Sequence, residues 1–342
     1  MPKRFARIDA VLRDAPCTAA VARIEHRGVC IFERAYGRTR ADDRALPVYV
    51  DTRFDLASIS KVFMAMLALR LVAAGALALD APLVAHIPEW RNRPHEAITL
   101  RMLLAHTSGM YSGAEYRKLF NENVASFAFN RELLALPGER VIYSDLGFIV
   151  LGALLERVTQ RALPALVRAH FPSATLGFCP LARERAGIPA TEDDGWRGRV
   201  QGSVHDEKAQ LMNGVAGHAG LFGTAADVAA LTESFLAPTR GNDAITLLPR
   251  ALACEAIREA AYDPVLRRGL GWALKTNDEN SCGRSFSPES FGHTGFVGTC
   301  VWADPVRDVQ AVLLTNTVYF GRADSRPLRA AFYEAVIEEL PQ

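Results

Sequence analysis

The chain has 342 residues, which is enough for one large domain or for two lobes around a sizeable core. Its 39 basic and 38 acidic side chains leave a net charge of +1, so the sequence lacks the basic excess of nucleic-acid-binding proteins and of proteins that dock on acidic membranes. Hydrophobic residues make up 49% of the chain and charged residues 23%, which is the balance of an ordinary globular enzyme.

The N-terminal segment is predicted to form a helix followed by a β-hairpin. Residues 5–14 are amphipathic and end before Pro16, and residues 19–24 and 29–34 are β-rich runs on either side of a glycine-containing turn. No apolar segment follows the basic N-terminus, so we expect no signal peptide. The 6 cysteines have no C-x-x-C spacing, which indicates free thiols in a reducing compartment. We therefore expect a cytoplasmic protein, or a periplasmic one if this chain is a trimmed mature form.

A long apolar helix is predicted to start at Ser58 and to end near Gly75. The apolar run at 62–79 is barely long enough to cross a membrane, and Arg70 interrupts it. A buried helix explains this run better, so we expect no membrane span.

The middle of the chain, residues 80–250, is rich in helical periodicity, proline and glycine. The clearest elements beyond residue 140 are two helices, at 146–160 and 225–236, three strands, at 269–274, 298–303 and 310–316, and a final helix at 326–340. Strands at both ends with helices between them predict an α/β (α+β) fold, in which a large all-α insertion splits an antiparallel sheet flanked by helices.

The chemistry-bearing motif is Ser58-Ile-Ser-Lys61. Residues three apart share one helix face, so the lysine can reach the Ser58 hydroxyl and activate it as a nucleophile. The alternative is a serine that only caps a helix start. Ser60 is one position short of this spacing and is not expected to be the nucleophile.

Two further motifs follow in chain order: Tyr143-Ser-Asp145 and His293-Thr294-Gly295. Tyr143 is a second candidate base, because nearby cations such as Lys61 can stabilise its phenolate; the alternative is a tyrosine buried for its ring. Whether Lys61 or Tyr143 takes the serine proton is left open by the sequence.

These three motifs in this order resemble the serine β-lactamase and penicillin-binding protein superfamily. The tyrosine in the second motif and the histidine in the third resemble the class C branch and its esterase, D,D-peptidase and D-aminopeptidase relatives. Segments 103–110 and 214–225 also resemble sequences of that family. The resemblance implies a sheet lobe of residues 1–60 and 255–342, a helical lobe of residues 61–254, and an active-site cleft between them. It also implies an oxyanion hole formed by the backbone N–H groups of Ser58 and Phe296.

Two positions depart from the family pattern. Asp145 stands where asparagine is usual; an ionised carboxylate only accepts hydrogen bonds, so recognition of a penicillin-type acylamino group should be weaker. His293 stands where lysine is usual, and we expect it to bind a substrate carboxylate more weakly and with a pH dependence near neutrality. The adjacent Thr294 and Gly295 would let a substrate pack close to the strand backbone.

We expect neither a metal nor a cofactor. His106 and His218 lie in segments that resemble structural turns of the family, and the other histidines have no metal-ligand spacing. The expected partner is a small molecule or a peptide: an ester, a D-amino-acid peptide or a β-lactam.

The leading interpretation is a metal-free serine hydrolase that forms an acyl-enzyme on an ester or a peptide-like amide. Esterase or D-amino-acid peptidase activity, with a muropeptide as one candidate substrate, ranks above β-lactam hydrolysis because of Asp145 and His293. The alternative is a non-catalytic binding or self-assembling relative. An α/β-hydrolase is excluded because Ser58 is not flanked by a Gly-x-Ser-x-Gly sequence.

Overall fold

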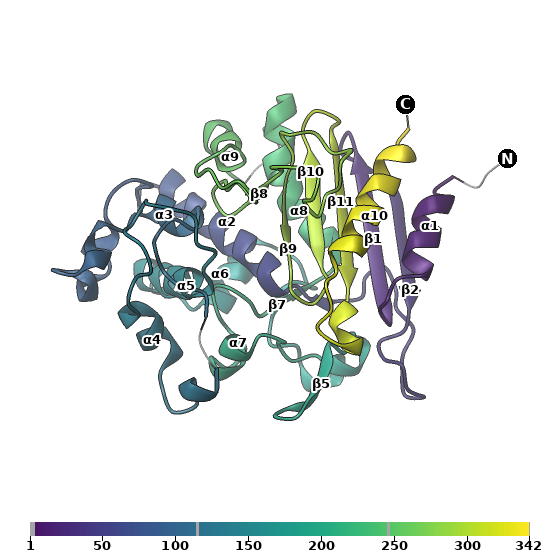
Figure 1. Cartoon of the computed structure of the whole chain (residues 1–342), viewed down its shortest axis with the longest axis horizontal. Helices are drawn as coiled ribbons and strands as arrows, with labels where there is room; N and C mark the ends of the chain where they lie inside the picture. Colours follow the sequence, from purple (N-terminus) through teal and green to yellow (C-terminus); the bar gives the residue numbers. More distant parts are fainter. Residues whose placement is uncertain (1–3, 114–115, 245–246, 342) are drawn as a thin grey trace.

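The N- and C-terminal parts of the chain together build one antiparallel sheet (Figure 1). The computed structural model describes residues 4–113, 116–244 and 247–341. Within these ranges the sheet has six strands in the order β2-β1-β11-β10-β9-β8. They are β1 (Ala19–His26), β2 (Val29–Gly37), β8 (Ala273–Leu274), β9 (Phe291–Thr294), β10 (Cys300–Asp304) and β11 (Val309–Thr315). The first and last strands of the chain are neighbours, since β1 pairs with β11. The predicted split antiparallel sheet is therefore confirmed.

Alternating residues of the strands pack against different helices. In β11, Val312 and Leu314 join the core that includes α8 (Ala225–Leu236), whereas Ala311 and Leu313 join the core under α1 (Ala6–Arg13) and α10 (Arg326–Glu338). This is the period-two burial of a strand in a sheet that is covered on both faces. The sheet is thus a central layer with helices on both sides.

Helix α8 corrects one detail of the predicted division. Its residues fall in the range 61–254, which the sequence assigned to the helical lobe, but the helix packs on β1, β10 and β11. Its buried residues, among them Val228 and Phe235, belong to the same core as the inner face of the sheet. A long range of helical periodicity does not show which surface each helix covers. The two-lobe division itself stays a prediction.

The helical part of the chain surrounds α2 (Ser60–Ala73) and α5 (Asp145–Thr159), which pack on each other. The shorter helices are α3 (Leu100–Leu104), α4 (Val124–Asn130), α6 (Leu163–His170), α7 (Glu207–Leu211) and α9 (Arg250–Ala256). The small sheets are β3 (Phe54–Asp55), β7 (Leu221–Gly223) and β4 (Gly177–Phe178) in one, and β5 (Glu192–Asp194) and β6 (Gly198–Val200) in the other.

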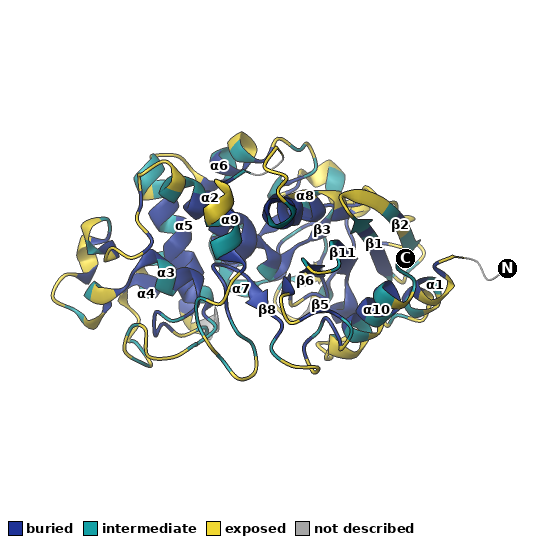
Figure 2. Cartoon of the chain, turned by 90° about the horizontal axis from the view of Figure 1, so that it is seen from above, coloured by how far each residue is buried: buried dark blue, intermediate teal, exposed yellow. Residues whose placement is uncertain are grey.

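Helix α2 is buried on all sides over its first ten residues, from Ser60 to Leu69 (Figure 2). An apolar helix without a polar face belongs inside a core. The helix ends before Gly75, whose φ of +72° is the left-handed conformation common after a helix C-terminus. Among the described residues no helix is both long and apolar enough to cross a membrane.

The third motif lies on a strand that the periodicity did not predict. Strand β9 consists of Phe-Gly-His-Thr, too short and too glycine-interrupted to show alternation, and it pairs with β10 from Thr294 with Cys300 to Phe291 with Ala303. The strand predicted at 269–274 was wrong for its first four residues, because only Ala273–Leu274 is extended and Gly271 turns the chain at φ +83°.

Candidate active site

Ser58 lies in a single tight turn, η1 (Ala57–Ile59), between β3 and α2. The turn is stabilised by Asp55, a buried carboxylate that accepts hydrogen bonds from the backbone N–H of Ala57 at 2.8 Å and from that of His205 at 2.7 Å. Ala57 has a φ of +46°, a strained conformation for a residue with a side chain. The turn holds Ser58 at the wall of the cavity described below.

Lys61 contacts both Ser58 and Asp145 of the second motif. Its Nζ donates to Ser58 Oγ at 2.9 Å and to the His218 carbonyl at 3.2 Å, and lies 2.8 Å from Asp145 Oδ1. The side chain is fully buried. Burial alone would lower the pKa of Lys61, but the charges of Asp145 and Tyr143 outweigh it and raise the pKa above its ordinary value. Lys61 is therefore an ammonium that donates to Ser58.

A second lysine balances the charge of Asp145. Lys208, on α7, lies 3.2 Å from Asp145 Oδ2 and 3.3 Å from Asp206, which in turn bonds His218 at 2.7 Å. Burial would raise the pKa of Asp145, but Lys61, His218 and Lys208 hold it well below its ordinary range. Both oxygens of Asp145 are thus engaged by ammonium groups.

This ion-pair network occupies the one place where a metal cluster is geometrically conceivable among the described residues. Ligand atoms of Asp145, Asp206 and His218 lie within 4.8 Å of one another. The ammonium of Lys208 already pairs with both carboxylates. We therefore assign these residues to ion pairing rather than to metal binding.

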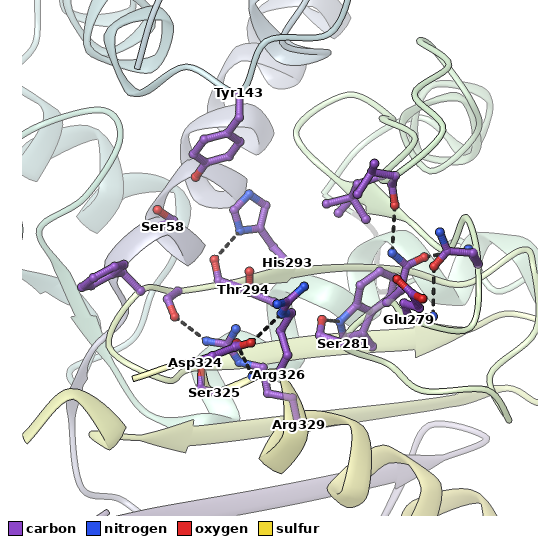
Figure 3. Close-up of a pocket in the computed structure, with 18 of the residues that line it drawn as sticks. Ser58, Tyr143, Glu279, Ser281, His293, Thr294, Asp324, Ser325, Arg326 and Arg329 are labelled. Carbon is purple, nitrogen blue, oxygen red and sulfur yellow. Dashed lines mark hydrogen bonds and ion pairs between the residues drawn. The ribbon is translucent and has the colours of Figure 1, made fainter. Parts of the chain in front are cut away.

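Tyr143 is placed by the start of α5 and by His106. The Ser144 side chain caps α5, and the backbone N–H of Ser144 donates to His106 Nδ1 at 3.1 Å. The His106 ring lies 4.6 Å from the Tyr143 ring, and Lys61 Nζ lies 4.9 Å from the centre of that ring. The Tyr143 hydroxyl points toward Ser58 (Figure 3). The first two motifs, far apart in sequence, are thus brought together around Ser58.

His293 differs from the expectation of a pH-dependent cation. Burial, together with the charges of Lys61 and Arg268, lowers the pKa of His293 to about 3. Its Nδ1 lies 2.9 Å from the Thr294 carbonyl, so in the neutral ring Nδ1 carries the proton and Nε2 presents a lone pair. A lone pair repels a carboxylate, so His293 is not suited to hold one at neutral pH.

The turn after β9 approaches Ser58 closely. Gly295 has no room for a side chain, because a Cβ there would lie 2.1 Å from Thr299 Oγ1 and 2.8 Å from the Leu56 carbonyl. Arg329 of α10 is buried and donates to the Gly295 carbonyl at 2.6 Å. The backbone N–H groups of Ser58 and Phe296 donate no hydrogen bond to another residue in the described part of the chain. Free N–H groups are what the predicted oxyanion hole requires.

These residues open onto a cavity of about 620 Å³. Ser58, Tyr143 and the third motif line one part of the cavity, and the start of α10 lies beside the third motif (Figure 3). Residues of the 277–281 loop also line the cavity. The half-exposed Phe296 ring and Val265 add apolar surface. The volume suits a small-molecule substrate.

Lys208 and Arg268 are the residues of this site that the sequence reasoning missed. Lys208 follows Asp206 on a five-residue helix with no motif around it, and Arg268 lies in a turn-rich segment, so neither carried a local signal. Lys208 lies far in sequence from Asp145, as Arg268 does from Tyr143, and only the folded chain shows these juxtapositions.

The fold and this arrangement define a class, the serine β-lactamase and penicillin-binding protein superfamily. A sequence profile of the Beta-lactamase family matches residues 7–334, nearly the whole chain. This chain therefore belongs to the β-lactamase family.

Relatives in this family bear names of hydrolases. The chain is 31% identical to the esterase EstB of Burkholderia gladioli, over 97% of this chain and 94% of that protein. It is 28% identical to a putative D-alanyl-D-alanine carboxypeptidase of Escherichia coli K12, over 86% of this chain and 77% of that protein. A penicillin-binding protein homologue from Caulobacter crescentus superposes with a TM-score of 0.77 at 22% identity, covering 99% of this chain and 98% of that one, which shows the shared fold. The protein is a serine hydrolase of the β-lactamase fold.

The Asp55 carboxylate, which holds the Ser58 turn through hydrogen bonds, makes the stability of the protein depend on pH. Burial raises the pKa of Asp55 from 3.8 to about 6, although hydrogen bonds from the His205 and Ala57 N–H groups oppose the shift. Between pH 7 and pH 5 the folded chain takes up a proton at Asp55 that the unfolded chain does not, so Asp55 should add about 1 kcal/mol to the free energy of unfolding as the pH falls. Urea unfolding of the wild type and of Asp55→Asn at both pH values should show that the change in the free energy of unfolding from pH 7 to pH 5 is more favourable in the wild type, by about 1 kcal/mol. An equal change in the two proteins would contradict the raised pKa.

Proposed function

We propose that this protein is an esterase that works through an acyl-enzyme on Ser58. The single observation that carries the proposal is the 2.9 Å hydrogen bond between Lys61 Nζ and Ser58 Oγ, at the wall of a cavity and beneath Tyr143. The Lys61 ammonium stabilises negative charge on Oγ as the serine loses its proton. Because the ammonium has no free lone pair, we assign the role of base to Tyr143.

In the proposed first step, Ser58 Oγ bonds to the ester carbonyl carbon while its proton passes to the phenolate of Tyr143, which the nearby Lys61 ammonium stabilises. The N–H groups of Ser58 and Phe296 bind the oxyanion. The tetrahedral intermediate then expels the alcohol, which takes the proton from Tyr143, and leaves an ester on Ser58. In the second step water adds to this ester, Tyr143 takes the water proton and returns it to Ser58, and the carboxylic acid departs.

The engagement of Asp145 favours esters over acylamino substrates such as penicillins. In the family pattern an asparagine occupies this position, and its amide can both donate to and accept from an acylamino group. Asp145 has no proton to donate, and its two oxygens pair with Lys61 and Lys208. An ester does not need this contact, and the relative EstB carries the name of an esterase.

The experiment that tests the proposal is intact-mass spectrometry after treatment with a fluorophosphonate, together with hydrolysis of p-nitrophenyl acetate. One adduct and catalytic turnover are expected in the wild type, and neither in Ser58→Ala. Ser60→Ala is the matched control: its buried hydroxyl accepts from the Leu221 N–H at 3.2 Å and does not line the cavity in the described part of the chain, so adduct and turnover should persist.

Parallel treatment with benzylpenicillin separates the remaining alternatives. We expect little or no penicilloyl adduct and little turnover of penicillin in the wild type. Fast penicillin turnover would replace the esterase assignment by that of a β-lactamase. A wild type that neither reacts with the fluorophosphonate nor hydrolyses the ester would leave the non-catalytic binding interpretation.

A further inference from the structure

Arg268 is a buried cation without an ion-pair partner in the described part of the chain. It lies between the strand-like bridges to Ala261 and Ala273 and lines the cavity that contains Ser58. The residue is 7% exposed, and its guanidinium carbon lies 5.3 Å from the centre of the Tyr143 ring. In the described part of the chain its guanidinium makes no hydrogen bond and no ion pair, and its Nε is buried without a partner.

An unpaired buried charge is costly, so its presence at a site calls for an explanation. Burial lowers the pKa of Arg268, but an arginine stays protonated in proteins. Contact with the face of an aromatic ring offsets part of the cost. The five N–H donors of the guanidinium have no acceptor among the described residues, and a planar fork of donors is the arrangement that recognises a carboxylate.

The other cations around the cavity already have partners. Arg322 pairs with Glu192 and Glu207, and Arg326 pairs with Asp324 (Figure 3). Arg329 bonds the carbonyls of the turn after β9.

The two positive candidates closest to Ser58 are also unavailable to an anion. Lys61 is engaged by Asp145, and neutral His293 presents a lone pair. Among the described cations that line the cavity, this leaves Arg268 to bind an incoming anion.

We propose that Arg268 binds a carboxylate on the leaving-group side of the ester substrate, so that the preferred substrates are esters of carboxylate-bearing alcohols or phenols. The position of Tyr143 indicates on which side of the ester this carboxylate lies. Tyr143 protonates the departing oxygen and therefore lies next to the leaving group, and Arg268 lies against the Tyr143 ring. This inference rests on the proposed esterase function.

A matched pair of esters tests the proposal: 3-carboxyphenyl acetate, and 3-carbamoylphenyl acetate as its neutral analogue. In Arg268→Met, which keeps an unbranched apolar side chain in place of the arginine stem and removes the guanidinium, we expect kcat/KM for the carboxylate ester to fall about 10- to 100-fold, as for loss of a hydrogen bond to a charged group. The value for the carbamoyl ester should stay within about twofold, and Arg268→Lys should recover part of the loss.

Arg326→Met is the control, because it removes an exposed arginine of the same cavity that is already paired with Asp324. It should leave the ratio of the two kcat/KM values unchanged. An equal loss for both esters in Arg268→Met would overturn the proposal, because Arg268 would then act through Tyr143 and not on the substrate. Equal kcat/KM values of the wild type for the two esters would also overturn the proposal.

Binding of the two phenol products keeps the proposal testable if Arg268→Met does not fold or if the ester chemistry fails. Calorimetry on the wild type should show 3-hydroxybenzoate binding at least about tenfold more tightly than 3-hydroxybenzamide. Equal binding would overturn the carboxylate site. Tighter binding of the benzoate without hydrolysis of either ester would retain the site and reject the esterase function instead.

Discussion

Replacing Lys61 by methionine is expected to lower kcat for hydrolysis of p-nitrophenyl acetate by about 1000-fold or more. The substitution removes the donor 2.9 Å from Ser58 Oγ, and with it the ammonium that contacts both Ser58 and Asp145. Loss of one preorganised donor costs on the order of 100- to 1000-fold in enzymes, and acid–base assistance contributes on the order of 100- to 10,000-fold. Lys61 is such a donor, and its charge also supports the proposed base, Tyr143. The rate should be measured with protein that has the wild-type circular dichroism spectrum.

The control for Lys61→Met is a substitution on the same buried helix that leaves the ion pairs intact. Ser60→Ala serves, because its hydroxyl faces the Leu221 N–H and not the cavity. Labelling by the fluorophosphonate should be slowed in Lys61→Met but should still occur at Ser58. A variant that retains more than about a tenth of the wild-type kcat would show that Lys61 is a structural ion-pair partner only.

The contact between Ser58 and Lys61 could be predicted because the spacing of the two residues places them on one helix face. Serine and lysine three apart at the head of an apolar run specify a shared helix face, and the structure places their side chains in direct contact. The run itself indicated burial, and α2 is buried on all sides over its first ten residues. The helix ranges at α5 and α8 were also close, because both have clear apolar periodicity and side-chain caps at Ser144 and Thr224.

Other features depend on contacts between distant segments and left no local pattern. Strand β9 is held by its pairing with β10, not by its own alternation. The protonation state of His293 follows from burial and from Lys61 and Arg268, so residue type alone predicted a charge that changes near neutral pH, whereas the fold makes a neutral ring. The sequence also identified Asp145 as a departure from the family pattern, but not the Lys208 that balances it.

The negative charge of Asp145 is balanced by the ammonium groups of Lys61 and Lys208. Asp145→Asn is expected to lower the free energy of unfolding by about 3–5 kcal/mol, because it leaves Lys61 and Lys208 as buried charges that face a neutral amide. The double variant Asp145→Asn/Lys208→Met removes a charge of each sign and should recover most of this loss. Urea unfolding of the wild type, both single variants and the double variant gives the coupling between the two positions.

The same double variant should change what the site accepts. With no ammonium of Lys208 beside it, the introduced asparagine can donate to and accept from an acylamino group through its amide, as in the family pattern. Without the carboxylate, burial is the first influence on the Lys61 ammonium, so its pKa should fall from the raised value of the wild type. We therefore expect penicilloyl adducts at Ser58 in the double variant, detected by intact mass, in larger yield than in the wild type. If stability recovers but the penicillin yield does not rise, Asp145 is needed for charge balance alone, and another part of the cavity excludes the acylamino group.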